Sequence, residues 1–191
     1  MSLAAGYALP ATLPTIRLTE AVVHRIAALA YAAKEPAFRA TGKYRFDDPA
    51  KGFSTLYCAR EFGTCFSETL LRGGGLMVSR AEYDNKAAVL LLLDVQHLVL
   101  VDMFTTAALM SLDLDLSIVA GSSYLDTQQL GTLTYHHGSK PHGIVYRSRY
   151  DPDQPAMVLF NRARAHVRRY PGSKAQRFAT VAELAAGVRN K

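Results

Sequence analysis

The sequence has few of the residues that mark specialised classes of protein. Its 191 residues include no tryptophan and two cysteines, Cys58 and Cys65. Two cysteines are too few for the disulfide scaffold of a small secreted domain. No further Cys or His stands beside them at the spacing of a zinc site, so we expect no metal site.

Long apolar runs are also missing. The longest, residues 87–93, is far shorter than the roughly 20 residues that a helix needs to cross a bilayer. Residues 1–18 lack the basic segment and apolar core of a secretory leader. We therefore expect a soluble cytoplasmic protein. Because no linker is long enough to separate domains, we expect residues 1–191 to form one domain.

The formal net charge of +6 is unevenly distributed. From Arg162 onward there are eight Lys and Arg against one acid, Glu183, so the preceding body is close to neutral. A nucleic-acid-binding domain more often has a basic face throughout, and we expect no direct binding of nucleic acid. A basic tail is more typical of a solvated edge or of a surface that meets an acidic partner.

The spacing of apolar residues alternates between helical and strand patterns, which predicts an α/β (α+β) domain. Strands are predicted at residues 53–58, 88–93, 98–101, 143–146, 157–160 and 162–168, the last of them alternating and basic on one face. Helices are predicted at residues 61–72, 103–111 and 127–137, the third with Asp126 as its cap, and a capping box at 180–183 predicts a short terminal helix. A short turn at residues 94–97 joins two of these strands.

Three segments are less regular. Residues 10–17 contain two prolines and are interpreted as a loop or an extended lead-in. Residues 19–33 keep helical spacing, but the stretch around His24 also fits a strand. Residues 35–52, rich in Pro, Gly and Asp, predict a long loop that holds one short extended piece around Arg45.

Four residues are candidates for chemistry: Arg45, Tyr57, Glu68 and Ser148. Each also has an ordinary structural interpretation. A glutamate on the flank of a helix is usually solvated, and a tyrosine in an apolar strand normally packs its ring and bonds its hydroxyl at the edge of the core. The arginine could pair with an aspartate of its own loop, and the serine could start the turn that follows it.

Together with their neighbours, these residues resemble the motifs of one family. They lie, in this order, in the short sequence motifs RFDDP, TLYCA, FSETLLR and GIVYRSRYDP. The set resembles the RES family, which is named for its Arg, Glu and Ser and is known mainly as toxins of bacterial toxin-antitoxin operons that destroy NAD. The resemblance spans about residues 24–163, and residues 164–191 are expected to form a basic extension with a strand and a helix.

The resemblance implies a compact fold similar to ADP-ribosyltransferases, with NAD held in a cleft between two small sheets flanked by helices. It implies that Arg45 binds NAD, and that Arg25, in a segment resembling the family's first strand, does so too. Arg17 and Arg39 are rival candidates for that first arginine. A cognate Xre-like antitoxin would be the protein partner.

The resemblance also assigns roles at the reacting end of NAD. Tyr57 positions the nicotinamide, Glu68 stabilises the transition state, and Ser148 orients either the nicotinamide ribose or Glu68. The residue types suit these roles, because arginine offers paired donors to phosphate, an aromatic ring can stack on nicotinamide, and a carboxylate can stabilise positive charge at C1′. Nicotinamide leaves as a neutral base from a cation, so one carboxylate can suffice where most glycosidases use two.

The acceptor of the ADP-ribosyl group stays open. Water would make the protein a glycohydrolase, inorganic phosphate a phosphorylase, and a protein side chain an ADP-ribosyltransferase. In each case NAD is a substrate and no prosthetic group is expected. The lack of a Gly-x-Gly-x-x-Gly motif argues against a Rossmann dehydrogenase. The alternative outside catalysis is a basic interaction or nucleic-acid-binding module on a RES scaffold.

Overall fold

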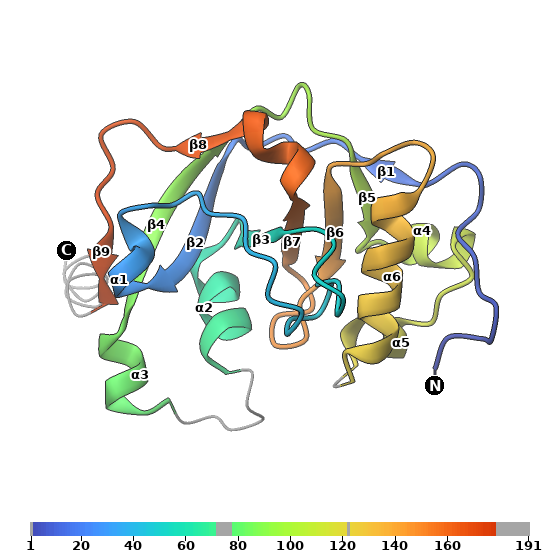
Figure 1. The fold of residues 1–191 in the computed structure, drawn as a ribbon, viewed down its shortest axis with the longest axis horizontal. Helices are drawn as coiled ribbons and strands as arrows, with labels where there is room; N and C mark the ends of the chain where they lie inside the picture. The colour runs from blue at the N-terminus through green and yellow to red at the C-terminus, as the bar shows by residue number, and fades with distance from the viewer. Residues whose placement is uncertain (1, 72–77, 122, 179–191) are drawn as a thin grey trace.

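The computed structural model describes residues 2–71, 78–121 and 123–178. Its centre is one nine-stranded sheet (Figure 1). The strands are β1 (Thr15–Ile16), β2 (Val22–Ala28), β3 (Thr55–Ala59), β4 (Lys86–Leu93), β5 (Leu100–Met103), β6 (Gly143–Arg147), β7 (Pro155–Phe160), β8 (Val167–Arg169) and β9 (Gln176–Arg177). Their order is β1-β5-β6-β7-β3-β2-β4-β8, with β9 also paired to β4. The pair β5–β6 is parallel and the other pairs are antiparallel.

The expected pair of small sheets is wrong, because β7 joins the two halves. It pairs with β6 on one side and with β3 on the other, in register with Leu56 opposite Leu159. Both faces of this central region are buried. Leu159 belongs to one apolar cluster with Leu56, whereas Val158 and Phe160 belong to a second cluster, as expected when successive side chains point to opposite faces.

Helices gather at the two ends of the sheet (Figure 1). They are α1 (Leu29–Ala32), α2 (Phe62–Leu70), α3 (Arg80–Asp84), α4 (Thr106–Ser111), α5 (Leu116–Ala120) and α6 (Leu125–His136), with a 3-10 helix, η1 (Asn161–His166). The first three lie beside β2, β3 and β4, and the next three lie beside β5 and β6. Among the described residues, no helix is both long enough and apolar enough to cross a membrane.

Most of the predicted elements are confirmed within a few residues. The ambiguous segment 19–33 contains both alternatives, since strand β2 runs directly into the single helical turn α1. The turn at 94–97 is present, but β4 and β5 lie far apart in the strand order and do not pair. The capping box at 180–183 lies outside the described residues.

Three local predictions are wrong. Arg45 lies in a turn, and the extended piece of its loop is instead at Arg39, which bridges Thr55. Helix α6 begins before Asp126, which lies in its first turn and accepts bonds from the Ser2 hydroxyl at 2.7 Å and from the Leu3 amide at 3.0 Å. These bonds hold the N-terminal segment against α6.

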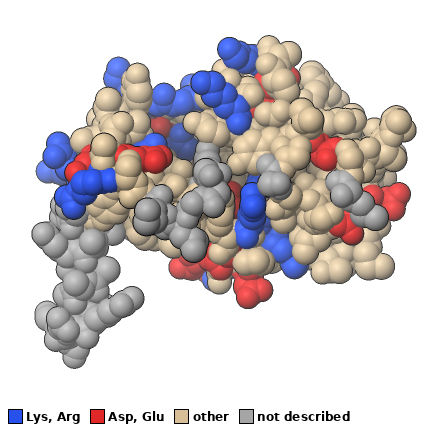
Figure 2. Space-filling model, turned by 90° about the horizontal axis from the view of Figure 1, so that it is seen from below, with Lys and Arg blue, Asp and Glu red and all other residues tan. Residues whose placement is uncertain are grey.

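The third error is the strand predicted at 162–168, which is mostly the 3-10 helix η1. Arg162 donates to the Tyr135 carbonyl at 2.7 Å and lies over the Tyr135 ring, whereas Arg164 lies over the Phe38 ring. Because the two arginines contact different parts of the molecule, they do not form one basic face. On the face shown in Figure 2, Lys and Arg lie in separate groups among Asp and Glu.

Candidate functional site

A cavity of about 400 Å³ lies where β2, β3 and α2 meet the loop that follows α1. We refer to it as the Glu68 cavity. Three of the predicted site residues line it: Arg25 from β2, Tyr57 from β3 and Glu68 from α2. A volume of this size falls in the usual range of small-molecule sites. The lining therefore combines a carboxylate, a guanidinium and an aromatic ring in one concave site.

Glu68 is held by donors from the segment that follows β6. Its Oε1 accepts the Ser148 hydroxyl at 2.8 Å and the Arg149 amide at 3.1 Å. Its Oε2 lies 3.4 Å from the hydroxyl of Tyr146, which also lines the cavity. Hydrogen bonds from the end of β6 and from the segment after it thus fix the orientation of a half-buried carboxylate.

Ser148 is fully buried and does not belong to the described lining of the Glu68 cavity. Its hydroxyl also accepts the amides of Tyr150 and Asp151, each at 3.2 Å, and so starts a turn as well as bonding Glu68. The Thr64 hydroxyl of α2 donates to the Asp151 carboxylate at 2.6 Å. This bond ties the turn to the helix that carries Glu68.

Tyr57 is anchored through its hydroxyl. The hydroxyl donates to Asp47 Oδ1 at 3.0 Å and accepts the Phe46 amide at 2.9 Å. Its ring meets the ring of Tyr44 edge to face, with centroids 5.8 Å apart. The hydroxyl thus binds the loop, and Tyr57 belongs to the lining of the cavity.

Asp47, which is only 1% exposed, organises this loop. Besides Tyr57, it accepts the Thr55 hydroxyl at 2.6 Å, the Tyr44 amide at 3.2 Å and the Thr41 hydroxyl. Hydrogen bonds from these donors replace the hydration that the Asp47 carboxylate loses on burial. Its position inside RFDDP is the sequence signal for this role.

Arg25 lies in an ion-pair network with a second buried carboxylate. Its Nε is 2.7 Å from Glu35 Oε2, and its NH1 donates to the Tyr57 carbonyl at 2.7 Å. Arg39 approaches Glu35 Oε1 at 3.8 Å and lies over the Tyr31 ring. All five of these residues line the Glu68 cavity. Two guanidinium groups against one carboxylate leave this end of the cavity with a positive excess.

Arg45 is placed elsewhere. It is 4% exposed, and its NH1 donates to the carbonyls of Val119 at 2.8 Å and Gly121 at 3.0 Å. Like Ser148, it does not belong to the described lining of the Glu68 cavity. Helix α6 approaches this loop closely, because a Cβ at Gly131 would lie 2.5 Å from the Phe46 carbonyl oxygen. The turn at Arg45 is therefore clamped between α5 and α6.

Both cysteines line the same cavity and are unoxidised. Burial raises the pKa of the Cys58 thiol to about 12, with a smaller contribution from Cys65. A thiol with such a pKa is protonated at neutral pH and is a poor nucleophile. Both thiols are buried, so the cysteines contribute small side chains to the wall of the cavity, and Glu68 is a carboxylate of the lining whose orientation is fixed by hydrogen bonds.

Sequence reasoning missed Glu35 and Tyr146 and named Arg39 only as a rival of Arg25. Arg39 carries no distinguishing local pattern, and neither does Glu35, apart from the proline that follows it. Tyr146 lies in the GIVYRSRYDP motif, two residues before Ser148, so the motif that pointed to Ser148 could also have pointed to Tyr146. Arg17, the other rival, is outside the described lining of the cavity.

Comparison with known proteins gives two matches. The model of the RES domain matches residues 22–180. The fold matches the toxin chain in the crystal structure of the M. tuberculosis MbcT-MbcA toxin-antitoxin complex, with a TM-score of 0.67 and 17% sequence identity over 90% of this chain and 92% of that chain. No curated protein sequence matches the chain.

Proposed function

The chain belongs to the RES domain family, and from this membership we propose that it is an NAD-consuming enzyme, the toxin of a bacterial toxin-antitoxin pair. The observation that carries the proposal is the carboxylate of Glu68, held by Ser148 and Arg149 at the wall of a cavity that also contains Arg25 and Tyr57. A carboxylate, a cationic end and an aromatic ring suit the developing positive charge at C1′, the pyrophosphate and the nicotinamide ring of NAD.

NAD would lie with its pyrophosphate toward Arg25 and Arg39 and its nicotinamide end toward Tyr57. Paired guanidinium donors suit phosphate oxygens, and Glu35 keeps Arg25 oriented at 2.7 Å. The ring of Tyr57 offers a flat apolar surface to the nicotinamide, since its hydroxyl is already bonded to Asp47. This arrangement would bring the nicotinamide ribose beside Glu68.

In the reaction, the bond between C1′ and the nicotinamide nitrogen breaks, and its electron pair leaves with the neutral base. The ribose then carries oxocarbenium character, which the negative charge of Glu68 stabilises. Ser148 acts as a positioning residue, because it touches Glu68 rather than the cavity. A carboxylate held in place before the reaction needs little reorganisation in the transition state.

We assign Arg45 an indirect part. The sequence-based prediction that it binds NAD stays a prediction, and its bonds to Val119 and Gly121 favour a role in holding the loop of Asp47. Through that loop Arg45 would set the position of Tyr57. Arg25 and Arg39 are the better placed groups for direct contact with phosphate.

The acceptor decides the class of enzyme, and product analysis determines it. Purified chain, free of any partner, is incubated with NAD in plain buffer, with inorganic phosphate, or with cell extract. Mass spectrometry then distinguishes ADP-ribose, ADP-ribose 1″-phosphate and ADP-ribosylated protein. Nicotinamide release with one of these products supports the proposal. Salt-dependent DNA binding without loss of NAD would support the noncatalytic module instead.

The fold match to a toxin chain of a toxin-antitoxin complex supports a cognate antitoxin as partner. We expect this antitoxin, an Xre-like protein, to silence the enzyme by blocking the Glu68 cavity. This inhibition can be tested directly, because co-expression with the product of the adjacent gene should abolish NAD loss and restore growth. A stable complex that still consumes NAD at the rate of the isolated chain would contradict this mode of control.

A further inference from the structure

A cluster of side chains of the types that can bind a metal ion lies at the β4–β5 turn, outside the lining of the Glu68 cavity. Asp94 directly follows β4, His97 is in the turn before β5, and His166 is the last residue of η1. We refer to these three residues as the Asp94 cluster. Asp94 and His166 are 72 positions apart in the sequence, and strand pairing brings them together.

The backbone fixes this arrangement. Strands β4 and β8 pair antiparallel, with Leu93 opposite Val167, so the residues just beyond this pair must face each other. The Asp94 amide donates to the His166 carbonyl at 2.9 Å, and the His97 amide donates to the Asp94 carbonyl at 3.2 Å. Main-chain hydrogen bonds thus set the backbone positions of all three residues.

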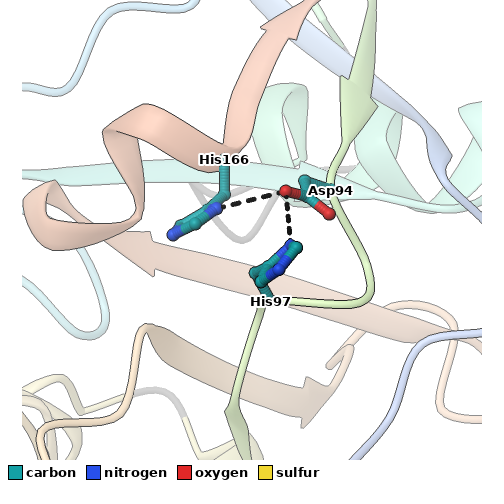
Figure 3. Close-up of side chains that lie close together, drawn as sticks. All are labelled: Asp94, His97 and His166. Carbon is teal, nitrogen blue, oxygen red and sulfur yellow. Dashed lines mark hydrogen bonds and ion pairs between the residues drawn. The ribbon is translucent and has the colours of Figure 1, made fainter.

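The side chains converge on one carboxylate oxygen (Figure 3). Asp94 Oδ2 lies 2.8 Å from His97 Nδ1 and 3.4 Å from His166 Nδ1. One ligand atom from each residue lies within 4.8 Å of the others. The two imidazole rings are nearly parallel, at 15°, with their centroids 5.7 Å apart.

We propose that the Asp94 cluster binds one divalent transition-metal ion of the zinc type. Two imidazoles and a carboxylate are ligands that zinc, cobalt and nickel share. Metal-ligand bonds of about 2.0–2.1 Å at tetrahedral angles place ligand atoms roughly 3.3 Å apart, close to the two separations from Asp94 Oδ2. His97 is 68% exposed and can rotate to shorten the remaining separation, and water completes the coordination.

The same three residues hold together without an ion, because each ring can hydrogen-bond the carboxylate. These bonds lower the pKa of Asp94, with the bond to His97 as the largest cause. Metal binding would require each ring to carry its proton on Nε2 instead of Nδ1, so that coordinate bonds replace the two hydrogen bonds while the backbone stays unchanged. Ligand atoms that already lie close together reduce the rearrangement that binding requires.

The surroundings make Asp94 the decisive ligand. A second cavity, of about 440 Å³, is lined by Asp94 and His166 and also by Arg168. The positive charge of Arg168 opposes a cation, and the carboxylate of Asp94 offsets it. None of the three cluster residues belongs to the described lining of the Glu68 cavity. The ion would cross-link the β4–β5 turn to the η1–β8 junction and would have a structural role outside the Glu68 cavity.

Calorimetric titration of tag-free protein with Zn²⁺, and absorption spectroscopy with Co²⁺, test the site. We expect one ion per chain, visible Co²⁺ bands typical of tetrahedral or five-coordinate nitrogen and oxygen ligation, and a melting temperature that rises with Zn²⁺ concentration. Asp94→Asn and His97→Ala should each weaken Zn²⁺ binding by at least about tenfold. Asp153→Asn and His136→Ala change exposed residues of the same types elsewhere and should bind like the parent.

His97 lies on the surface, so its variant should fold even where His166→Ala does not. Zn²⁺ affinity and Co²⁺ bands that are the same in the parent and in both cluster variants would place any bound ion elsewhere and overturn the proposal. Absence of saturable binding to the parent would overturn it as well, and would leave a hydrogen-bonded carboxylate and two histidines.

Discussion

A 2.8 Å hydrogen bond from the Ser148 hydroxyl to Glu68 Oε1 joins two residues that are 80 positions apart. It connects α2 to the turn that follows β6, and the bond from Thr64 to Asp151 reinforces the same connection. Glu68 therefore has a fixed orientation that its own helix does not provide. The predictions below test whether this fixed carboxylate and its supporting residues act as a catalytic unit.

Ser148→Ala should lower kcat by about 10- to 100-fold with little change in KM, because a misplaced carboxylate stabilises the transition state less well. In the Glu68→Gln background the same substitution should cost little further activity, since its role acts through Glu68. Kinetics of the two single variants and the double variant measure this coupling. Independent, multiplicative losses would show that Ser148 affects the rate by another route.

Tyr57→Phe should reduce the free energy of unfolding by about 1–3 kcal/mol, because the buried Phe46 amide loses its acceptor. KM for NAD should stay near the parent value, since the ring remains. Tyr57→Ala should raise KM roughly two- to tenfold, matching the 0.5–1.5 kcal/mol typical of an aromatic contact. Tyr7→Phe removes a hydroxyl bonded to the Leu112 carbonyl and is the kinetic control, because neither Tyr7 nor Leu112 belongs to the described lining of the cavity.

Glu35→Gln should lower the free energy of unfolding by about 3 kcal/mol, because it removes the negative charge of a fully buried side chain that is paired with the largely buried Arg25. KM should also rise as Arg25 loses its orientation. Glu20→Gln breaks an exposed pair with Arg60 and should change stability by less than about 1 kcal/mol. Urea unfolding compares the two variants, and equal small effects would contradict the assigned role of Glu35.

Iodoacetamide should leave the native protein unmodified at pH 8, because Cys58 and Cys65 are buried and the pKa of Cys58 is raised to about 12. After unfolding in urea, both cysteines should react. The raised pKa also means that the unfolded chain loses the Cys58 proton first, so the free energy of unfolding should fall as the pH rises above 9.0, the ordinary pKa of a cysteine thiol. Rapid alkylation of native protein, measured by mass spectrometry, would show that the cavity wall opens.

The elements that local patterns determine could be predicted from the sequence. Helix α2 and strands β3, β6 and β7 are examples, since their apolar spacing matches their burial. The 3-10 helix η1 could not, because its alternating arginines contact Tyr135 and Phe38, which are remote in sequence. A basic alternating pattern does not reveal such contacts.

The same limit applies to the site. Arg25, Tyr57 and Glu68 were predicted and line one cavity, and the bond of Ser148 to Glu68 agrees with one of its two predicted orienting roles. Glu35 and the Asp94 cluster were missed because their contacts depend on chain segments brought together by the tertiary fold. The single sheet was missed for the same reason, since the β3–β7 pairing that unites it joins distant segments.

The most direct test compares NAD consumption by the parent chain, Glu68→Gln and Glu82→Gln, the last of which changes another carboxylate that lines the cavity. Chromatography follows NAD and nicotinamide, with water, phosphate and cell extract as alternative acceptors. We predict that the parent and Glu82→Gln consume NAD, and that Glu68→Gln melts like the parent but is at least about 100-fold slower, matching the roughly 3 kcal/mol typical of lost transition-state electrostatics. Failure of the parent to consume NAD with any acceptor, or a Glu68→Gln variant as active as the parent, would contradict the account.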